Sequence, residues 1–310
     1  MDYQQNTQKN HKMLNQTSGV LVIDKPVGMT SHDVVQAVRR GTGIRRAGHT
    51  GTLDPRASGV LVVLIGPAVR LSEFLTTSEK RYQAVMKFGM TTSTYDTEGA
   101  ITSQGREYNF EFEDLEEALT KFVGEVEQTP PVYSALKIDG RRAYELARKG
   151  EEIEMEPRKI TVHSLELLEW EAPEAVIDIH CSSGTYIRSL AHDLGEEMGS
   201  GATLINLRRT KNGRFTLRDS VSLRKLEEAF ANGDWYRYLI PAAEALADWY
   251  TVELSFDQVD EVRHGHRVPA LEPMEPGSLA RAISQEGELV ALVEYIEEDQ
   301  EWQPRKVFMM

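Results

Sequence analysis

Hydrophobic positions along the chain follow two periods, which predict strands and helices in mixed order. The stretches GVLVIDKP (19–26) and GVLVVLIG (59–66) are almost wholly apolar, which predicts buried strands. KRYQAVMKFG (80–89) is apolar at every second residue from Tyr82 to Phe88, as in a strand with one buried face. Further strands are expected at 133–140, 159–167 and 175–182, with a polar loop at 91–105.

Helical periods lie between these strands. Ser31 is the expected cap of a helix over 31–40, with Gly41 and Gly43 after its end. Pro67 suits the first turn of a short helix after the second strand. Four more helices are expected at 112–123, 141–150, 182–199 and 222–246, the last with a break at Gly233.

This order of elements favours an α+β fold over a doubly wound parallel sheet, because hairpin-like loops and short crossovers both occur. Around Trp249 the pattern changes to short strand-like runs separated by Gly and Pro, which predicts a small β module. The N-terminal segment has no apolar stretch, so it is no signal peptide and is expected to be disordered. The predicted division is a disordered tail at 1–17, a main domain at 18–247 and the β module at 248–310.

The composition is that of a soluble globular protein, with 310 residues of which 40% are hydrophobic and 27% charged. No apolar run approaches the roughly 20 residues that span a bilayer. The single cysteine, Cys181, suits a reducing compartment and, without a recognisable histidine partner, is expected to be buried. We therefore expect a cytoplasmic protein without a membrane partner.

The net charge of −14 is distributed unevenly. Residues 1–70 carry nine Lys and Arg against four Asp and Glu, a balance of +5, and residues 177–215 carry five against four. The balance is −10 in 71–176 and again in 216–310. Local potential, rather than total charge, attracts a phosphate backbone. The pattern alone leaves two interpretations open, an RNA-binding groove and an uneven solvated surface.

One carboxylate stands within the Gly- and Thr-rich segment GHTGTLDPRASGVL (48–61). Asp54 precedes a proline, which by itself is ordinary turn chemistry. Arg188 falls in the first turn of the helix expected at 182–199, where a cation opposes the helix dipole. Such an arginine is commonly solvated; the alternative is that it holds a carboxylate, for which Asp54 is the candidate. An adjacent Arg keeps an Asp ionised, the state that a nucleophile needs.

A resemblance to a known family rests on six segments between Ser18 and Phe215: GVLVIDKPVGMTSHDVV, GHTGTLDPRASGVL, KRYQAVMKFG, TPPVYSALKIDGRRAYELAR, CSSGTYIRSLAHDLG and LRRTKNGRF. In this order they resemble the bacterial tRNA pseudouridine synthases of the TruB type, which isomerise uridine 55 in the T loop of tRNA. The resemblance implies the pseudouridine synthase fold, a mixed and mostly antiparallel sheet with flanking helices. It also implies the T arm of tRNA as partner and a PUA-like RNA-binding domain for the C-terminal module.

The same resemblance implies roles for individual residues. Asp54 is the catalytic nucleophile and Arg188 is its partner. Tyr82 stacks on the target base and assists removal of its C5 proton. His49 belongs to the group that fills the gap left by the flipped nucleotide. The remaining pocket residues are Tyr186 and Leu207.

The reaction keeps all its atoms in one pocket, so no cofactor is expected. His264 and His266 in RHGHR are expected on one strand face, but two imidazoles without further ligands make a weak metal site, and no metal is expected. No obligate protein partner is evident, and we expect a monomer. Phosphate contacts are expected from four arginines upstream of Asp54, namely Arg39, Arg40, Arg45 and Arg46.

Two other classes of function fit parts of the pattern. An RNA-binding or tRNA-folding module that acts without catalysis would explain the basic segment and the β module, but Asp54, Tyr82 and Arg188 favour an enzyme. Phosphoryl transfer through Asp54 is disfavoured because the chain has no P-loop sequence and no second aspartate two residues further on. The pattern does not decide between RNA contact and solvated loop charge for Asp96, Arg141 and Arg142.

Overall fold

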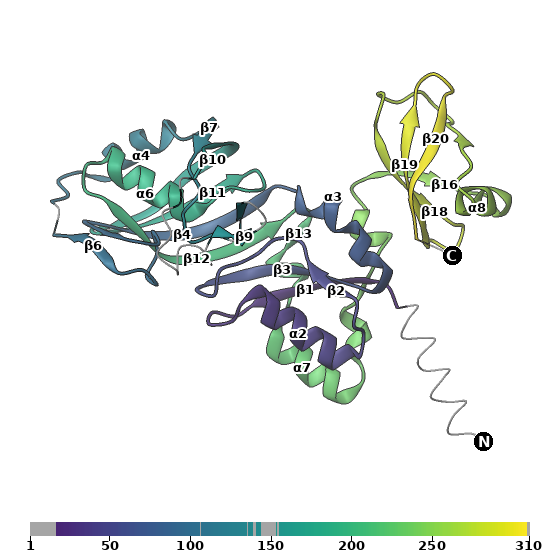
Figure 1. Ribbon diagram of the computed structural model, residues 1–310, viewed down its shortest axis with the longest axis horizontal. Helices are drawn as coiled ribbons and strands as arrows, with labels where there is room; N and C mark the ends of the chain where they lie inside the picture. Colours follow the sequence, from purple (N-terminus) through teal and green to yellow (C-terminus); the bar gives the residue numbers. More distant parts are fainter. Residues whose placement is uncertain are drawn as a thin grey trace.

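The structure, a computed structural model, describes residues 17–308 except 106, 135, 139–140, 144–152 and 154. Its main part is a large mixed sheet with helices packed on it (Figure 1). Along this sheet the strands follow the order β14 (Val221–Ser222), β1 (Gly19–Lys25), β3 (Ala57–Ile65), β12 (Ala202–Asn212), β4 (Lys80–Phe88), β11 (Glu174–Cys181), β10 (Arg158–Glu171) and β7 (Gly124–Gln128). Three short strands pair at its sides: β2 (Ala47–His49), β13 (Phe215–Thr216) and β15 (Ile240–Pro241).

Most strand pairs in this sheet are antiparallel, and the parallel pairs are β1 with β14 and β3 with β12. The strands β1 and β3 are apolar over most of their length because both of their faces are covered. Leu21 and Ile23 contribute to the main core on one face, whereas Val20 and Val22 belong to a second core on the other face. β4 instead alternates between buried and more exposed residues, as its sequence predicts.

Four helices pack on the sheet in two pairs, which lie at different ends of the strand order (Figure 1). The helices α2 (Ser31–Thr42) and α7 (Leu223–Asn232) pack against each other beside β1, and α4 (Phe112–Thr120) and α6 (Ile187–Glu197) cover the half that contains β4, β10 and β12. All four helices contribute to the main core. Gly41 lies inside α2 rather than after it, where a Cβ would stand 2.1 Å from the ring of Phe230 in α7.

The C-terminal module is a second sheet with the order β16 (Tyr250–Glu253), β18 (Leu279–Ile283), β19 (Leu289–Ile296), β20 (Glu301–Val307) and β17 (Val268–Pro269). It packs on the second core through Leu289 and Leu292. The contact is made on the segment after β3, which holds the 3₁₀ helix η1 (Gly66–Leu71) and the helix α3 (Ser72–Thr76). There, Arg70 donates a hydrogen bond of 2.5 Å to the Val307 carbonyl. The α+β prediction and the small C-terminal β module are confirmed.

The structure corrects several local predictions. Thr30, not Ser31, caps α2, because Asp33 completes a capping box with Thr30. Within 91–105 there is a hairpin of β5 (Met90–Thr92) and β6 (Ile101–Gln104), where a loop was expected. The segment of His264 and His266 ends a helix, α8 (Phe256–Arg263), and is not a strand. Sequence reasoning also missed β7 and β12.

Between residues 133 and 143 the structure describes only the short hairpin of β8 (Lys137–Ile138) and β9 (Arg141–Arg142), in place of the longer strand expected at 133–140. Of the helix expected over 141–150, Arg141 and Arg142 form β9 instead, and residues 144–150 lie outside the described residues, as does the N-terminal tail through residue 16. Gly233 does end α7, as predicted, but the helix expected to continue to residue 246 is wrong: β15 and the 3₁₀ turns η3 (Trp235–Tyr238) and η4 (Glu244–Leu246) occupy that segment. A further 3₁₀ turn is η2 (Leu217–Asp219). Among the described residues, no helix is long and apolar enough to cross a membrane.

Candidate active site

The loop between β2 and β3 carries Asp54 and is fastened at several points. The first helical residue of α2, Ser31, donates from its hydroxyl to the Leu53 carbonyl at 3.1 Å and accepts from the Leu53 N–H at 2.8 Å. The Gly28 N–H donates to the Pro55 carbonyl at 2.8 Å, and the Ala57 N–H donates to the Asp54 carbonyl at 3.0 Å. These bonds hold the Asp54 loop to the first residue of α2, to the loop before α2 and to the start of β3.

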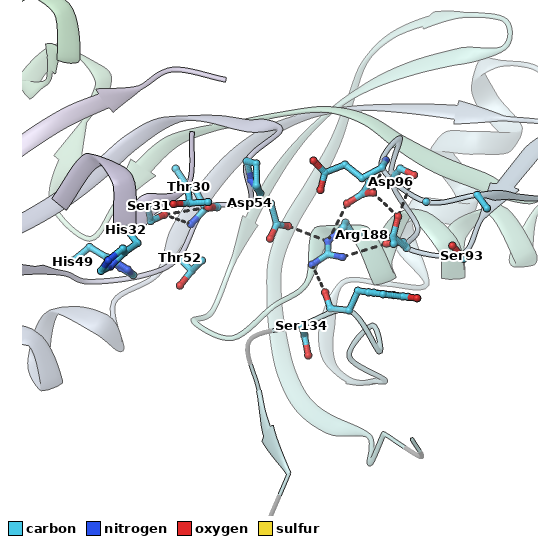
Figure 2. A pocket seen from close by; sticks show the side chains of 17 residues that line it. Thr30, Ser31, His32, His49, Thr52, Asp54, Ser93, Asp96, Ser134 and Arg188 are labelled. Atoms are coloured by element: carbon cyan, nitrogen blue, oxygen red, sulfur yellow. Dashed lines mark hydrogen bonds and ion pairs between the residues drawn. The ribbon is translucent and has the colours of Figure 1, made fainter. Parts of the chain in front are cut away.

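Arg188 connects this loop to the other half of the sheet (Figure 2). Its Nε lies 3.0 Å from Oδ2 of Asp54 and 3.6 Å from Oδ2 of Asp96. Its two terminal nitrogens donate to the carbonyls of Thr94 at 3.2 Å and Tyr133 at 3.1 Å. The side chain of Arg188 is only 7% exposed, so these partners fix the plane of the guanidinium.

One buried cation therefore faces two carboxylates that differ in environment. Asp96 is enclosed, with its side chain 9% exposed, and accepts hydrogen bonds from the Thr94 hydroxyl at 2.5 Å and the Glu98 N–H at 2.9 Å. Asp54 is 39% exposed. Asp96 is thus a buried partner of Arg188 rather than a solvated loop charge, and Asp54 is the more accessible carboxylate of the two.

A cavity of about 410 Å³ brings together five of the residues singled out from the sequence, and its walls include Asp54, Tyr82, Tyr186, Arg188 and Leu207. Tyr82 belongs to β4, Tyr186 precedes α6, and Leu207 lies opposite Ala57 and Ala84 in β12. Burial raises the pKa of Tyr82 and that of Tyr186, so both hydroxyls stay protonated at neutral pH. The cavity combines one carboxylate with apolar and aromatic walls.

Three buried cations beside this cavity were not predicted. Arg209 is 1% exposed and donates to the carbonyls of Val60 at 2.8 Å and Gly51 at 3.1 Å. Burial lowers the pKa of Lys80, which lines the same cavity, to about 8. Burial likewise lowers the pKa of Lys25 to about 8, against the opposing effect of Asp54. Arg209 could have been identified from the sequence, because it stands two residues after the expected pocket residue Leu207.

A second and larger cavity, of about 930 Å³, lies on the other side of Asp54 and includes His32 and His49 in its wall (Figure 2). Nδ1 of His49 accepts a hydrogen bond of 3.3 Å from the Gly51 N–H, which places the imidazole proton on Nε2. Burial, with Arg209 nearby, lowers the pKa of His49 and keeps the ring neutral. Asp54 and Arg188 line both cavities, so a chain that crosses from one to the other must pass them.

The four arginines expected to contact phosphates lie away from Asp54. α2 begins beside the Asp54 loop, and a rise of about 1.5 Å per residue carries Arg39 roughly 12 Å from that end. Arg39 is partly buried and donates to the Ala47 carbonyl at 2.6 Å, so one of its donors serves the fold. The other three side chains are exposed: Arg40, Arg45 and Arg46. Arg141 is exposed, and the side chain of Arg142 lies outside the described residues.

Cys181 is fully buried, as predicted, and burial raises its thiol pKa to about 11, which leaves it unreactive at neutral pH.

Comparisons with solved structures agree with this arrangement over nearly the whole chain. A chain in the structure of an H/ACA RNP bound to a substrate RNA containing 2′-deoxyuridine superposes with a TM-score of 0.74 at 27% identity, covering 96% of this chain and 87% of that one. A chain of a Cbf5–Nop10–Gar1 complex superposes with the same TM-score at 28% identity and the same coverage. A mixed sheet of this kind, followed by a small C-terminal sheet, is the fold of a pseudouridine synthase.

The sequence comparisons narrow this class. Residues 39–187 match the family model of the TruB family pseudouridylate synthase N-terminal domain, and residues 188–247 match that of the tRNA pseudouridylate synthase B C-terminal domain. The chain is 43% identical over 280 residues to the tRNA pseudouridine synthase B of Solibacter usitatus, spanning 90% of this chain and 96% of that relative. It is 45% identical over 254 residues to that of Symbiobacterium thermophilum, spanning 81% and 83%. The chain belongs to the TruB family of pseudouridylate synthases.

Proposed function

We propose that this protein converts uridine 55 in the T loop of tRNA to pseudouridine, with Asp54 as the nucleophile. Relatives that align over nearly their full length are named tRNA pseudouridine synthase B, which supports tRNA as the substrate. The observation that carries the mechanism is the position of Asp54. It is the reachable carboxylate of the Arg188 pair and lies in the wall that the two cavities share.

The reaction breaks the N1–C1′ bond of uridine, turns the base and joins C5 to C1′. The C5 proton leaves and N1 gains a proton, so substrate and product are isomers and no co-reactant is needed. A carboxylate promotes the reaction by adding to C6 of the ring or to C1′ of the ribose, and both routes begin with an ionised Asp54. The guanidinium of Arg188, 3.0 Å away, holds the carboxylate in place for this attack.

The smaller cavity provides a place for the extruded base. Flipping a nucleotide out of a folded loop costs a few kcal/mol, and stacking on an aromatic ring such as Tyr82 returns about 1–3 kcal/mol per base. Leu207 and Tyr186 enclose the base and exclude water. The Tyr82 hydroxyl is a neutral phenol, so it assists loss of the C5 proton by holding a hydrogen-bonded acceptor rather than as a free phenolate.

Recognition of the T arm is assigned to surfaces on both sides of this base pocket. The larger cavity, with His49 in its wall, accommodates the loop that the base leaves. Arg40, Arg45 and Arg46 are assigned to phosphates further along the stem, since they are exposed and lie in the last turn of α2 or just after its end. The module at 248–310 is assigned as a PUA-like contact to the rest of the tRNA.

The decisive experiment is conversion of an unmodified T-arm hairpin by Asp54→Asn, measured as tritium release from C5-labelled uridine and by mapping of pseudouridine. We expect no conversion, with hairpin affinity within a few fold of wild type, because only the charge of the nucleophile is lost. The control is Glu228→Gln, which neutralises an exposed carboxylate on α7 that pairs with Arg224 and lies in the wall of neither cavity, and which should turn over normally. Turnover by Asp54→Asn would falsify the assignment.

Assays with the hairpin and with full-length tRNA test two finer parts of the proposal, the position of the modified uridine and the occurrence of catalysis. Conversion at another uridine would refute position 55 while leaving the enzyme class intact. Binding without conversion by the wild-type protein would favour the alternative, an RNA-folding module. Deleting 248–310 is unsuitable as a test, because Leu289 and Leu292 share a core with β1 and β3. Charge-changing variants on the outer surface of the full-length chain are the appropriate ones.

A further inference from the structure

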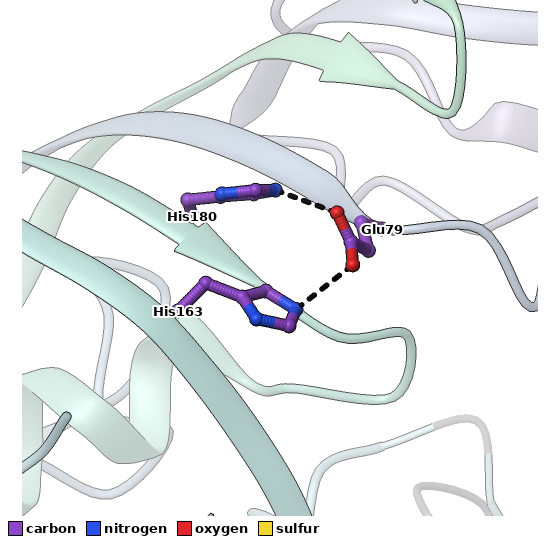
Figure 3. A group of neighbouring side chains, drawn as sticks. All are labelled: Glu79, His163 and His180. Atoms are coloured by element: carbon purple, nitrogen blue, oxygen red, sulfur yellow. Dashed lines mark hydrogen bonds and ion pairs between the residues drawn. The ribbon is translucent and has the colours of Figure 1, made fainter. Parts of the chain in front are cut away.

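A group of two histidines and one glutamate lies on the face of the large sheet opposite the main core (Figure 3). Glu79 directly precedes β4, His163 belongs to β10 and His180 to β11. Nε2 of His163 lies 3.2 Å from one carboxylate oxygen of Glu79, and Nε2 of His180 lies 2.9 Å from the other. Neither cavity of the active site includes any of these three residues in its wall.

The pairing of β10 with β11 sets the two histidines on one face. Val162 pairs with Cys181 and both are fully buried, so the next residues, His163 and His180, lie on the opposite face of the sheet. A register shift then pairs Ser164 with His180 and leaves His163 as an extra residue beside that pair. The two imidazole rings lie 4.7 Å apart, tilted by 44°. Both rings direct Nε2 at the same carboxylate.

We propose that Glu79, His163 and His180 form a binding site for a divalent transition-metal ion of the Zn²⁺ class. Two imidazoles and a carboxylate are a ligand set that such ions accept, with the remaining position left to water. Tetrahedral ligands about 2.05 Å from Zn²⁺ lie about 3.4 Å from one another. The three ligand atoms already lie within 4.8 Å of one another, so closing the site needs a movement of at most about 1.4 Å.

The surroundings of Glu79, His163 and His180 allow these side chains to shift and to bind a metal ion. The side chains of His163 and His180 are 33% and 30% exposed, so small rotations of the rings are open to them. The nearest cation in register with His180 is Arg81, which is paired with Asp178 at 2.5 Å and does not compete for Glu79. A bound ion takes the place of the two hydrogen bonds between the imidazoles and Glu79. Each imidazole then binds the ion through Nε2, which requires its ring proton to lie on Nδ1.

The site is structural and does not take part in the isomerisation. An ion here ties the ends of β10 and β11 to the residue before β4. Lys80, the next residue, lines the smaller cavity, so the ion fixes one edge of the base pocket without touching the base. Turnover of the T-arm hairpin in EDTA should therefore persist, whereas thermal stability should rise with added zinc.

The test is a titration of the full-length protein with Zn²⁺ against a chromophoric chelator, together with Co²⁺, whose visible d–d bands report the ligand geometry. We expect one equivalent to bind. Glu79→Gln, His163→Gln and His180→Gln should each lower the association constant by about tenfold or more and remove the zinc-dependent rise in melting temperature. The control variant, His264→Gln with His266→Gln, removes two exposed histidines elsewhere and should bind like the wild type.

Three results would overturn the proposal. Absence of saturable one-to-one binding, or binding that survives all three substitutions, would overturn the proposal. Binding lost in the His264 and His266 double variant would place the metal in the C-terminal module instead and would equally overturn it. Since the three residues are partly exposed, the melting temperatures of the variants in EDTA should match the wild type within a few degrees, and this confirms that each variant is folded.

Discussion

Ser31→Ala tests how the Asp54 loop is held. The Ser31 hydroxyl makes two hydrogen bonds to the backbone of Leu53, one residue before Asp54, and both residues are at most 3% exposed. Removal of the hydroxyl leaves a buried N–H and a buried C=O unpaired. An unsatisfied buried group costs about 1–3 kcal/mol, and the nearby cavity admits water, so we expect a loss of about 2–3 kcal/mol in the free energy of unfolding.

The same change should slow conversion by about tenfold or more, because displacement of a catalytic group by 1 Å costs up to about a hundredfold. The matched control is Thr30→Ala, which removes the cap of α2 but no bond to the loop. A lost cap costs about 1 kcal/mol and should leave kcat unchanged. Urea unfolding gives the stability of both variants, and single-turnover conversion of the T-arm hairpin gives the rate. Equal rates for the two variants would show that Ser31 does not position the loop.

Three further predictions follow from the buried and exposed cations. Arg188→Lys keeps the charge but loses the planar donors to two carbonyls, so urea unfolding should show a loss of about 2–4 kcal/mol, with slower conversion; unchanged stability would argue against the clamp. Arg45→Gln should weaken the binding of all RNAs by a similar factor and lower the slope of log K against log salt by about 0.7–0.9. Arg39→Gln loses a hydrogen bond to the Ala47 carbonyl and should instead lower the melting temperature. The folded-state pKa of Lys25 and of Lys80 is about 8, below the ordinary 10.5. The unfolded chain therefore binds more protons between these values, and the free energy of unfolding contributed by both groups should rise from pH 8 to 10.5. Lys80→Met should show a smaller rise in urea titrations across that window, and an equal rise would contradict the assignment.

The hydrophobic pattern alone identifies the strands whose faces are uniformly covered, either on both sides or on one. β1 and β3 are covered on both faces and β4 on one, so their hydrophobic periods are uninterrupted. β12 was missed because its sequence is rich in polar residues. Arg209 and Asn212 are nonetheless buried there, since Arg209 donates to backbone carbonyls of neighbouring segments. A polar residue whose partner is distant backbone has no signature in local sequence.

The N-cap of α2 could have been identified from the sequence, but it was assigned to the wrong residue. Thr30 and Ser31 are both good capping residues, but only Thr30 has an acidic residue three positions later, Asp33. Ser31 is then released for a contact with Leu53 that no local rule predicts. The short strands β5 and β6 were missed for a related reason, since β6 is largely exposed and β5 buries two threonines, so the hairpin has little hydrophobic period to reveal it.

The sequence by itself determined the succession of elements, the α+β class and the candidate residues Asp54, Tyr82 and Arg188, because these depend on local periods and on specific motifs. Only the tertiary structure decided which of them meet. The pairing of β12 between β3 and β4 sets Leu207 and Arg209 beside Tyr82, and the packing of α6 brings Arg188 to Asp54 and Asp96. The same holds for Glu79, His163 and His180, which a bulge and two strand pairings assemble from three distant segments. Register and burial are properties of the whole sheet, so no window of sequence contains them.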